Sequence, residues 1–106
     1  MTNALAAAAL DALGHESRRT MLDQLRRGEQ SVRELTEASA LTQGAVSQHL
    51  KVLRDANLVR VRAHGTRRLY AIDPDGLAPV RAWVDSFWDD ALRSFVEHTE
   101  RRDPRA

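Results

Sequence analysis

Two helix starts stand close together near the centre of the chain, and they constrain the fold more than any other feature. In Ser31-Val32-Arg33-Glu34 the serine hydroxyl can accept the N3 amide while the glutamate accepts the cap amide, which is a capping box. Thr42 offers the next N-cap hydroxyl after a short link. Two short helices joined so closely must cross at a sharp angle, which predicts a helix-turn-helix.

The second of these helices, over residues 42–54, has two distinct faces. At about 100° per residue, its apolar side chains gather on one side and its polar side chains on the other. Amides, a hydroxyl, a glycine and two cations suit hydrogen bonding to base edges and phosphates in a DNA major groove. An ordinary solvated helix face is the alternative for this helix taken alone. The polar face holds Gln43, Gly44, Ser47, Gln48, Lys51 and Arg54.

A small net charge of +1 conceals an uneven distribution along the chain. Residues 1–41 hold five basic and six acidic side chains, and residues 73–106 hold five and eight. Between them, residues 42–72 hold six basic side chains and one acidic, a local net charge of +5. Because clustered cations attract a polyanion through counterion release and steering, this segment is predicted to face nucleic acid.

The periodicity changes to two after this helix, which predicts a β-hairpin over residues 58–72. Valines alternate with arginines at first, and residues 67–72 again mix apolar and cationic positions around the turn His64-Gly65-Thr66. A hairpin that only covers the core, with arginines protecting its edge, is the alternative. Its position after the helix-turn-helix and its positive charge favour a wing that contacts DNA.

Beyond Asp73-Pro74-Asp75-Gly76, a long helix is predicted with an apolar stripe along one broad face. Both tryptophans and both phenylalanines of the protein lie on it. A small core cannot absorb so long a stripe, so part of it is expected to pack against a second copy of the chain. A stripe buried entirely within one chain is the alternative. The stripe includes Trp83, Phe87, Trp88, Ala91 and Phe95.

Composition excludes several classes of protein. The 106 residues suit one domain, and they contain no cysteine, which excludes disulfides and thiolate metal sites and favours a reducing cytoplasm. No apolar run approaches the roughly 20 residues that span a bilayer. The chain also lacks a nucleophile elbow and a glycine-rich phosphate loop. We therefore expect a cytoplasmic protein without enzymatic activity, cofactor or membrane contact.

Four strings share their order and spacing with a known family: LGHESRR (13–19), VREL (32–35), AVSQHLKVL (45–53) and GTRRLY (65–70). Together they resemble the ArsR-type winged-helix transcriptional regulators of bacteria, over nearly the whole chain. The resemblance implies a mainly α, dimeric winged helix-turn-helix with five helices and a two-stranded hairpin. It further implies a DNA-binding regulator, in most members a repressor, that an effector releases from its operator.

The resemblance also assigns tasks to segments of the single domain over residues 1–106. Helices within residues 1–14 and 76–101 are expected to form a homodimer, residues 31–56 the helix-turn-helix and residues 58–72 the wing. Two recognition helices would then enter successive major grooves of an imperfect palindrome. Through its first helix the resemblance adds two residues to the dimer interface expected from the stripe, Leu5 and Ala9.

Contacts to DNA are expected from two groups of residues. Base contacts are predicted for Gln43, Gly44, Ser47 and Gln48. His49 falls on the apolar side of its helix, so we expect it to pack in the core and not to read bases. Phosphate or wing contacts are predicted for Ser31, Thr42, Lys51, Arg54, Arg62, His64, Arg67 and Arg68.

No metal site is predicted, because the ligand positions of the family's metal sensors are largely lost. Leu35, Thr36 and Glu37 stand where those sensors carry thiolates, and the last helix retains at most one ligand. Two alternatives stay open: a metal-responsive sensor with an unconventional site at the dimer interface, including residues such as His98, and a winged-helix protein-protein adaptor. Without a metal, the signal could come from a separate effector-sensing protein.

Overall fold

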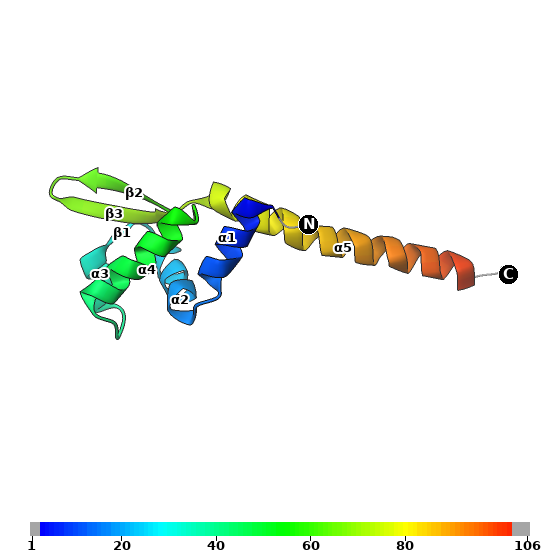
Figure 1. Cartoon of the computed structure of the whole chain (residues 1–106), viewed down its shortest axis with the longest axis horizontal. Helices are drawn as coiled ribbons and strands as arrows, with labels where there is room; N and C mark the ends of the chain where they lie inside the picture. The colour runs from blue at the N-terminus through cyan, green and yellow to red at the C-terminus, as the bar shows by residue number, and fades with distance from the viewer. Residues whose placement is uncertain (1–2, 103–106) are drawn as a thin grey trace.

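The computed structural model describes residues 3–102, and these form five α-helices and three antiparallel strands. A rounded head, made of α1 to β3 and the first turns of α5, lies at one end of a molecule 71 Å long, and the rest of α5 projects from it (Figure 1). The elements are α1 (Ala4–Leu13), α2 (Glu16–Leu25), β1 (Gln30–Ser31), α3 (Val32–Glu37), α4 (Gln43–Asp55), β2 (Val59–His64), β3 (Arg67–Ile72) and α5 (Pro74–Arg102).

Both predicted helix starts are confirmed. The Ser31 hydroxyl accepts the Glu34 amide at 3.2 Å, while the Glu34 carboxylate accepts the Ser31 amide at 3.0 Å. The Thr42 hydroxyl accepts the Ala45 amide at 3.1 Å, which starts α4. Since each cap satisfies amides that the first helical turn leaves unpaired, the sequence itself fixes where α3 and α4 begin.

The predicted hairpin is present, but the sheet has three strands and not two. Strands β2 and β3 pair antiparallel from Val59 opposite Ile72 to His64 opposite Arg67. On the other edge of β3 lies β1, which makes the order β1-β3-β2. A two-residue strand is too short to show a periodicity in the sequence, so β1 is recognised only from its pairing with β3. Through β1, the start of α3 is joined to the wing, which we define as β2, β3 and their turn.

The core of the head forms around the inner side of α4. Val46, Leu50 and Leu53 of this helix are fully buried, as its apolar periodicity predicted. They pack with the buried Leu35 of α3 and Leu58 before β2. Because this side of α4 is held in the core, its opposite side must face outward.

Helix α5 meets the head at a close contact between two backbones. A Cβ atom placed on Gly76 would lie only 1.5 Å from the carbonyl oxygen of Asn57, so only glycine fits there. Asn57 itself has a left-handed backbone, with φ of 63°, directly after α4. The first turns of α5 are therefore placed against the end of α4.

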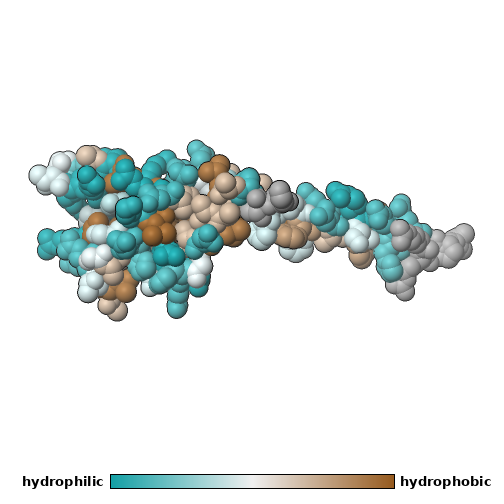
Figure 2. Space-filling model, viewed as in Figure 1, coloured by the Kyte–Doolittle hydropathy of each residue, from teal (hydrophilic) through white to brown (hydrophobic). Residues whose placement is uncertain are grey.

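Beyond residue 83, every α5 side chain up to residue 100 is exposed in the single chain. We call residues 84–100 the far half of α5. It carries most of the predicted aromatic stripe, with Phe87, Trp88 and Phe95 each more than half exposed. Apolar side chains are visible at intervals along this part of the helix, well outside the head (Figure 2). The alternative of a stripe buried within one chain is therefore wrong.

Candidate nucleic-acid interface

The predicted base-contacting residues share one exposed face of α4. Gln43, Gly44, Ser47 and Gln48 are all exposed, opposite the buried Leu50. Apart from its chain neighbours and the backbone of its own helix, no atom of residues 3–102 comes within 4 Å of where a Cβ on Gly44 would lie, so a partner can approach the backbone closely there. The structure brings the four predicted residues together on a face that no other element covers.

Basic and other polar side chains extend this face along α4 and onto the wing. Lys51 and Arg54 are exposed on later turns of the helix, and Arg68 and His64 are exposed on the wing. Lys51 pairs with Asp55 at 3.0 Å on the same helix. Within residues 3–102, Arg54, Arg60 and Arg68 make no ion pair.

Two of the predicted phosphate-binding arginines already have carboxylate partners. Arg62 of β2 binds Glu29 through two hydrogen bonds of 2.7 Å, and Arg67 of β3 binds Glu34 at 2.7 Å. The hydrogen bond from Arg62 holds the pKa of the Glu29 carboxyl below its usual range and raises that of Arg62. The amide of Ser31, helped by Arg67, lowers the pKa of Glu34. Both carboxylates are therefore charged partners at neutral pH.

Sequence reasoning did not identify Glu29 and Glu34 as part of the interface. Each lies far from its arginine along the chain, and the pairs form only because β1 brings this segment beside the wing. The sequence predicts Glu34 as part of a helix cap, but it does not predict the hydrogen bond from Arg67. No local pattern in the sequence indicates such pairs.

Two predicted positions lie elsewhere than expected. Ser31 is only 7% exposed and its hydroxyl accepts the Glu34 amide in the cap of α3, so its role in the structure is to position that helix. Ala9 is fully buried in the core of its own chain, and the assignment of this residue to the dimer interface is wrong. Leu5, one turn earlier on α1, is 57% exposed.

A groove joins the start of α4 to the tip of the wing. We call the α4 face that carries Gln43, Gly44, Ser47 and Gln48 the reading face. Gln43 and two wing residues, Arg67 and Arg68, border the same hollow, which is also lined by residues of α3. Helix and wing therefore form one continuous surface with both hydrogen-bonding and cationic groups. The lining residues are Ser31, Val32, Arg33, Glu34, Glu37, Gln43, Thr66, Arg67 and Arg68.

His49 is half-buried on the inner side of α4, in agreement with its predicted position. Its ring lies 4.7 Å from that of His15, and its Nδ1 is 3.4 Å from the Arg18 guanidinium. Burial lowers the pKa of His49, and the neighbouring His15 and Arg18 lower it further. Arg18 also donates to the carbonyl of Ala12 at 2.6 Å, so this cluster joins α1, α2 and α4.

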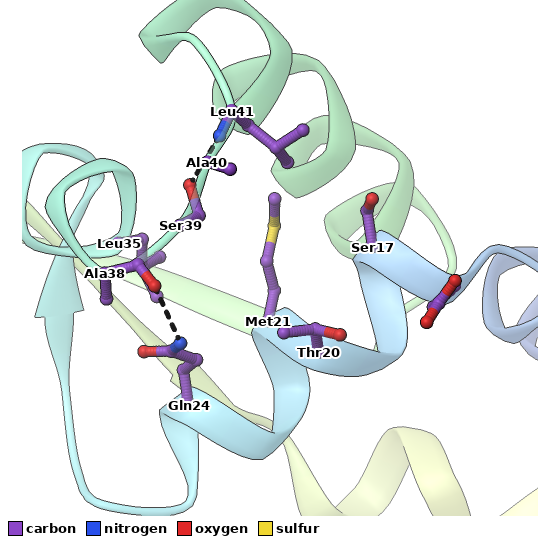
Figure 3. A pocket seen from close by; sticks show the side chains of 10 residues that line it. Ser17, Thr20, Met21, Gln24, Leu35, Ala38, Ser39, Ala40 and Leu41 are labelled. Atoms are coloured by element: carbon purple, nitrogen blue, oxygen red, sulfur yellow. Dashed lines mark hydrogen bonds between the residues drawn. The ribbon is translucent and has the colours of Figure 1, made fainter.

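A second hollow lies between α2 and the turn that connects α3 to α4 (Figure 3). Met21 projects into it, and two hydrogen bonds beside it stabilise the turn. Gln24 donates to the carbonyl of Ala38 at 3.3 Å, and the Ser39 hydroxyl accepts the Leu41 amide at 3.2 Å. The polar groups around this hollow therefore hold the turn that sets the angle between α3 and α4.

Within residues 3–102, no three His, Asp or Glu side chains lie close enough together to hold a metal ion. None of the helices in that range combines the length and apolarity needed to cross a membrane.

Comparison with known proteins identifies similar sequences and structures. A family model described as "Bacterial regulatory protein, arsR family" matches residues 15–61. The HTH-type transcriptional regulator Rv2034 of Mycobacterium tuberculosis is 44% identical over 89 residues, which cover 84% of this chain and 83% of the relative.

Two solved structures agree with this result. A possible transcriptional regulator for arsenical resistance has 41% identity and a TM-score of 0.70, with 85% of this chain and 94% of that chain covered. A homodimeric winged helix-turn-helix DNA-binding domain from Mycobacterium bovis has 31% identity and a TM-score of 0.66, with 83% and 82% covered.

Proposed function

The chain belongs to the ArsR family of bacterial transcriptional regulators, which are DNA-binding proteins and not enzymes, and we propose that it is a homodimeric repressor of an imperfect palindromic operator. One observation carries this proposal. The polar face of α4 is exposed, continuous with a cationic wing and held outward by the buried side of the same helix. Such a surface fits a major groove and its flanking phosphates.

Base reading is assigned to Gln43, Gly44, Ser47 and Gln48. A glutamine side chain can bond both N6 and N7 of adenine, and Ser47 can donate to or accept from several bases. The open space around Gly44 allows the helix backbone to lie close to the base edges. Substitution of Gln48 by alanine should then cost about 1 to 3 kcal/mol of binding and relax preference at one base position.

Phosphate contacts are assigned to residues around this face. Thr42, Lys51 and Arg54 border the helix, and the wing adds the rest of the cations. Because phosphate contacts do not depend on base identity, the loss of a cation that has no carboxylate partner among the described residues, such as Arg54, should weaken binding to all sequences alike. The wing residues are Arg62, His64, Arg67 and Arg68.

Dimerisation is assigned to Trp83 and the far half of α5, together with the exposed edge of α1. Monomeric proteins rarely expose contiguous apolar stripes, and a twofold axis would cover the stripe of each chain with that of the other. The related domain from Mycobacterium bovis is described as homodimeric, which supports the same assembly. The interface residues are Leu5, Trp83, Phe87, Trp88, Ala91 and Phe95.

A gel-shift and footprinting experiment on the DNA upstream of its own gene tests the proposal. We expect a footprint with twofold symmetry, and an affinity that falls steeply as salt rises. A uniform loss of affinity in the Gln48→Ala variant would remove Gln48 from the base readers. Absence of any salt-sensitive shift, on this DNA and on random fragments, would favour a protein-protein adaptor instead.

The signal that releases the protein from DNA is tested in the same assay. Footprints with and without zinc and nickel, together with calorimetry of each ion, decide whether a metal at the dimer interface controls binding. If neither ion binds or changes the footprint, another ligand, a separate effector-sensing protein or the abundance of the regulator itself must supply the signal.

A further inference from the structure

The wing is tied to the helical part of the head by two ion pairs on its two strands. On β2, the guanidinium of Arg62 meets Glu29 side by side, with two bonds of 2.7 Å. Paired bonds of this kind fix the direction of both groups. On β3, Arg67 meets Glu34. Each carboxylate lies beside β1, outside the wing.

Glu34 performs two tasks with one oxygen atom. Its Oε1 accepts the Ser31 amide at 3.0 Å and the Arg67 guanidinium at 2.7 Å. The start of α3 and the wing are therefore linked through a single carboxylate. Arg67 also borders the groove that Gln43 and Arg68 share, so this link lies within the proposed DNA surface.

Both arginines remain accessible while they are paired. The side chains of Arg62 and Arg67 are 55% and 53% exposed, and their partners Glu29 and Glu34 are 36% and 47% exposed. A phosphate can therefore approach either guanidinium without any rearrangement of the core. Arg68, next to Arg67 on β3 and opposite Ala63 of β2, has no carboxylate partner among the described residues.

We propose that Glu29 and Glu34 are specificity-determining residues, which hold the wing arginines in the free protein and compete with DNA phosphates for them. This inference rests on the proposed function. A paired arginine contributes little attraction to a polyanion, and the carboxylate repels an approaching phosphate. Only a DNA backbone whose phosphates lie in the correct register, as on the operator, displaces or bridges these arginine–glutamate pairs. DNA of any other sequence receives no contribution from these arginines.

Substitution of Glu29 by glutamine gives the clearest test, because Glu34 also caps α3. The Glu29→Gln variant keeps the size of the side chain and removes its charge. Freed Arg62 should then release one further counterion on random DNA, which steepens the plot of log affinity against log salt by about 0.9. At 0.1 M salt this corresponds to about eightfold tighter binding of random duplex. Affinity for the operator should change less, so discrimination falls.

Two control variants isolate the ion pair. Asp23→Asn makes the same change in total charge at the Arg26–Asp23 pair on α2, beside Leu77 of α5 and apart from the groove. Its salt slope should match that of the wild type. The double variant Glu29→Gln/Arg62→Gln should lose the extra slope, because Glu29 acts through Arg62. Thermal melting of each variant confirms that the head is folded.

Fluorescence anisotropy on operator and random duplexes, over a range of salt concentrations, gives all these slopes. An unchanged slope in Glu29→Gln, or an equal change in Asp23→Asn, would overturn the inference while salt-dependent binding by the wild type still supports the proposed function. Failure of the wild type to bind either duplex would instead overturn the proposed function.

Discussion

The head and the far half of α5 differ in the burial of their apolar side chains. In the head, Leu50 and Leu53 of α4 are completely buried by neighbours from the same chain. In the far half of α5, Trp88 is 65% exposed and Phe95 is 68% exposed. The head is therefore complete as a folded unit, whereas the far half needs a second surface to bury its aromatic side chains.

This difference separates two tasks along one chain. The head fixes the orientation of the reading face by local packing, and in the proposed dimer the far half would determine how two heads are held relative to each other. The first turns of α5 are placed by the contact of Gly76 with Asn57, by packing along α1 and by Leu77 and Val80 against the core. In the proposed dimer, the distance between two recognition helices would therefore depend on this junction.

The largest expected effect comes from the far half. Trp88→Asp places a charge in the proposed dimer interface, where burial without a partner is unfavourable. We expect a monomer by sedimentation and a loss of affinity for the palindromic operator of roughly 100-fold or more, because the avidity of two linked heads disappears. Asp89→Ala, one residue later, is the control and should keep the dimer. A dimeric Trp88→Asp protein would show that the stripe is not the interface.

In the head, the core variant Leu50→Ala should lower the free energy of unfolding by about 2 to 5 kcal/mol, because it leaves a cavity beneath the reading face. Urea unfolding in the Trp88→Asp background measures this loss without a contribution from the dimer. Leu92→Ala, at a position 61% exposed in the far half, is the matched control with little expected change. Equal losses at both positions would contradict the contrast between the two regions.

Substitution at the junction of Gly76 with Asn57 should have a different effect from substitution in the head or in the far half of α5. In Gly76→Ala the new Cβ would overlap the Asn57 carbonyl, so α5 must move relative to α4, at a cost of about 1 to 3 kcal/mol. We expect a stable dimer whose preferred spacing between operator half-sites is changed, with weaker binding to the native operator. Gly14→Ala, whose Cβ would lie 3.3 Å from the Asp11 carbonyl, is the control. Unchanged operator affinity and spacing in Gly76→Ala would show that the junction does not set the geometry.

Features encoded by neighbouring residues were predictable from the sequence. The caps at Ser31 and Thr42 and the inward side of α4 depend on residues within a few positions of each other. Strand β1, the carboxylate partners of Arg62 and Arg67, and the burial of Ala9 depend on segments far apart in the chain. Such contacts require knowledge of the fold. The amphipathic pattern predicts the exposed polar face of α4. It does not predict the Arg62–Glu29 and Arg67–Glu34 ion pairs, which partly neutralise the wing.

The smallest expected effect is a pH dependence of the free energy of unfolding that arises in the head and leaves the dimer unchanged. Folding lowers the pKa of His49 below its ordinary value near 6.5, so the unfolded chain binds a proton more readily. The free energy of unfolding should therefore decrease as pH falls from about 6.5 toward the lowered pKa of the folded protein. Urea unfolding at several pH values should show a flatter dependence in His49→Gln. His64→Gln, at the exposed wing, controls for the loss of a histidine. Because the ring and hydrogen-bond partners of His49 are His15 and Arg18, at the start of α2 and away from the far half of α5, titration of His49 should leave dimerisation through α5 unchanged. Acid dissociation of the dimer that His49→Gln abolishes would show that the head and the far half are coupled more tightly than their packing indicates.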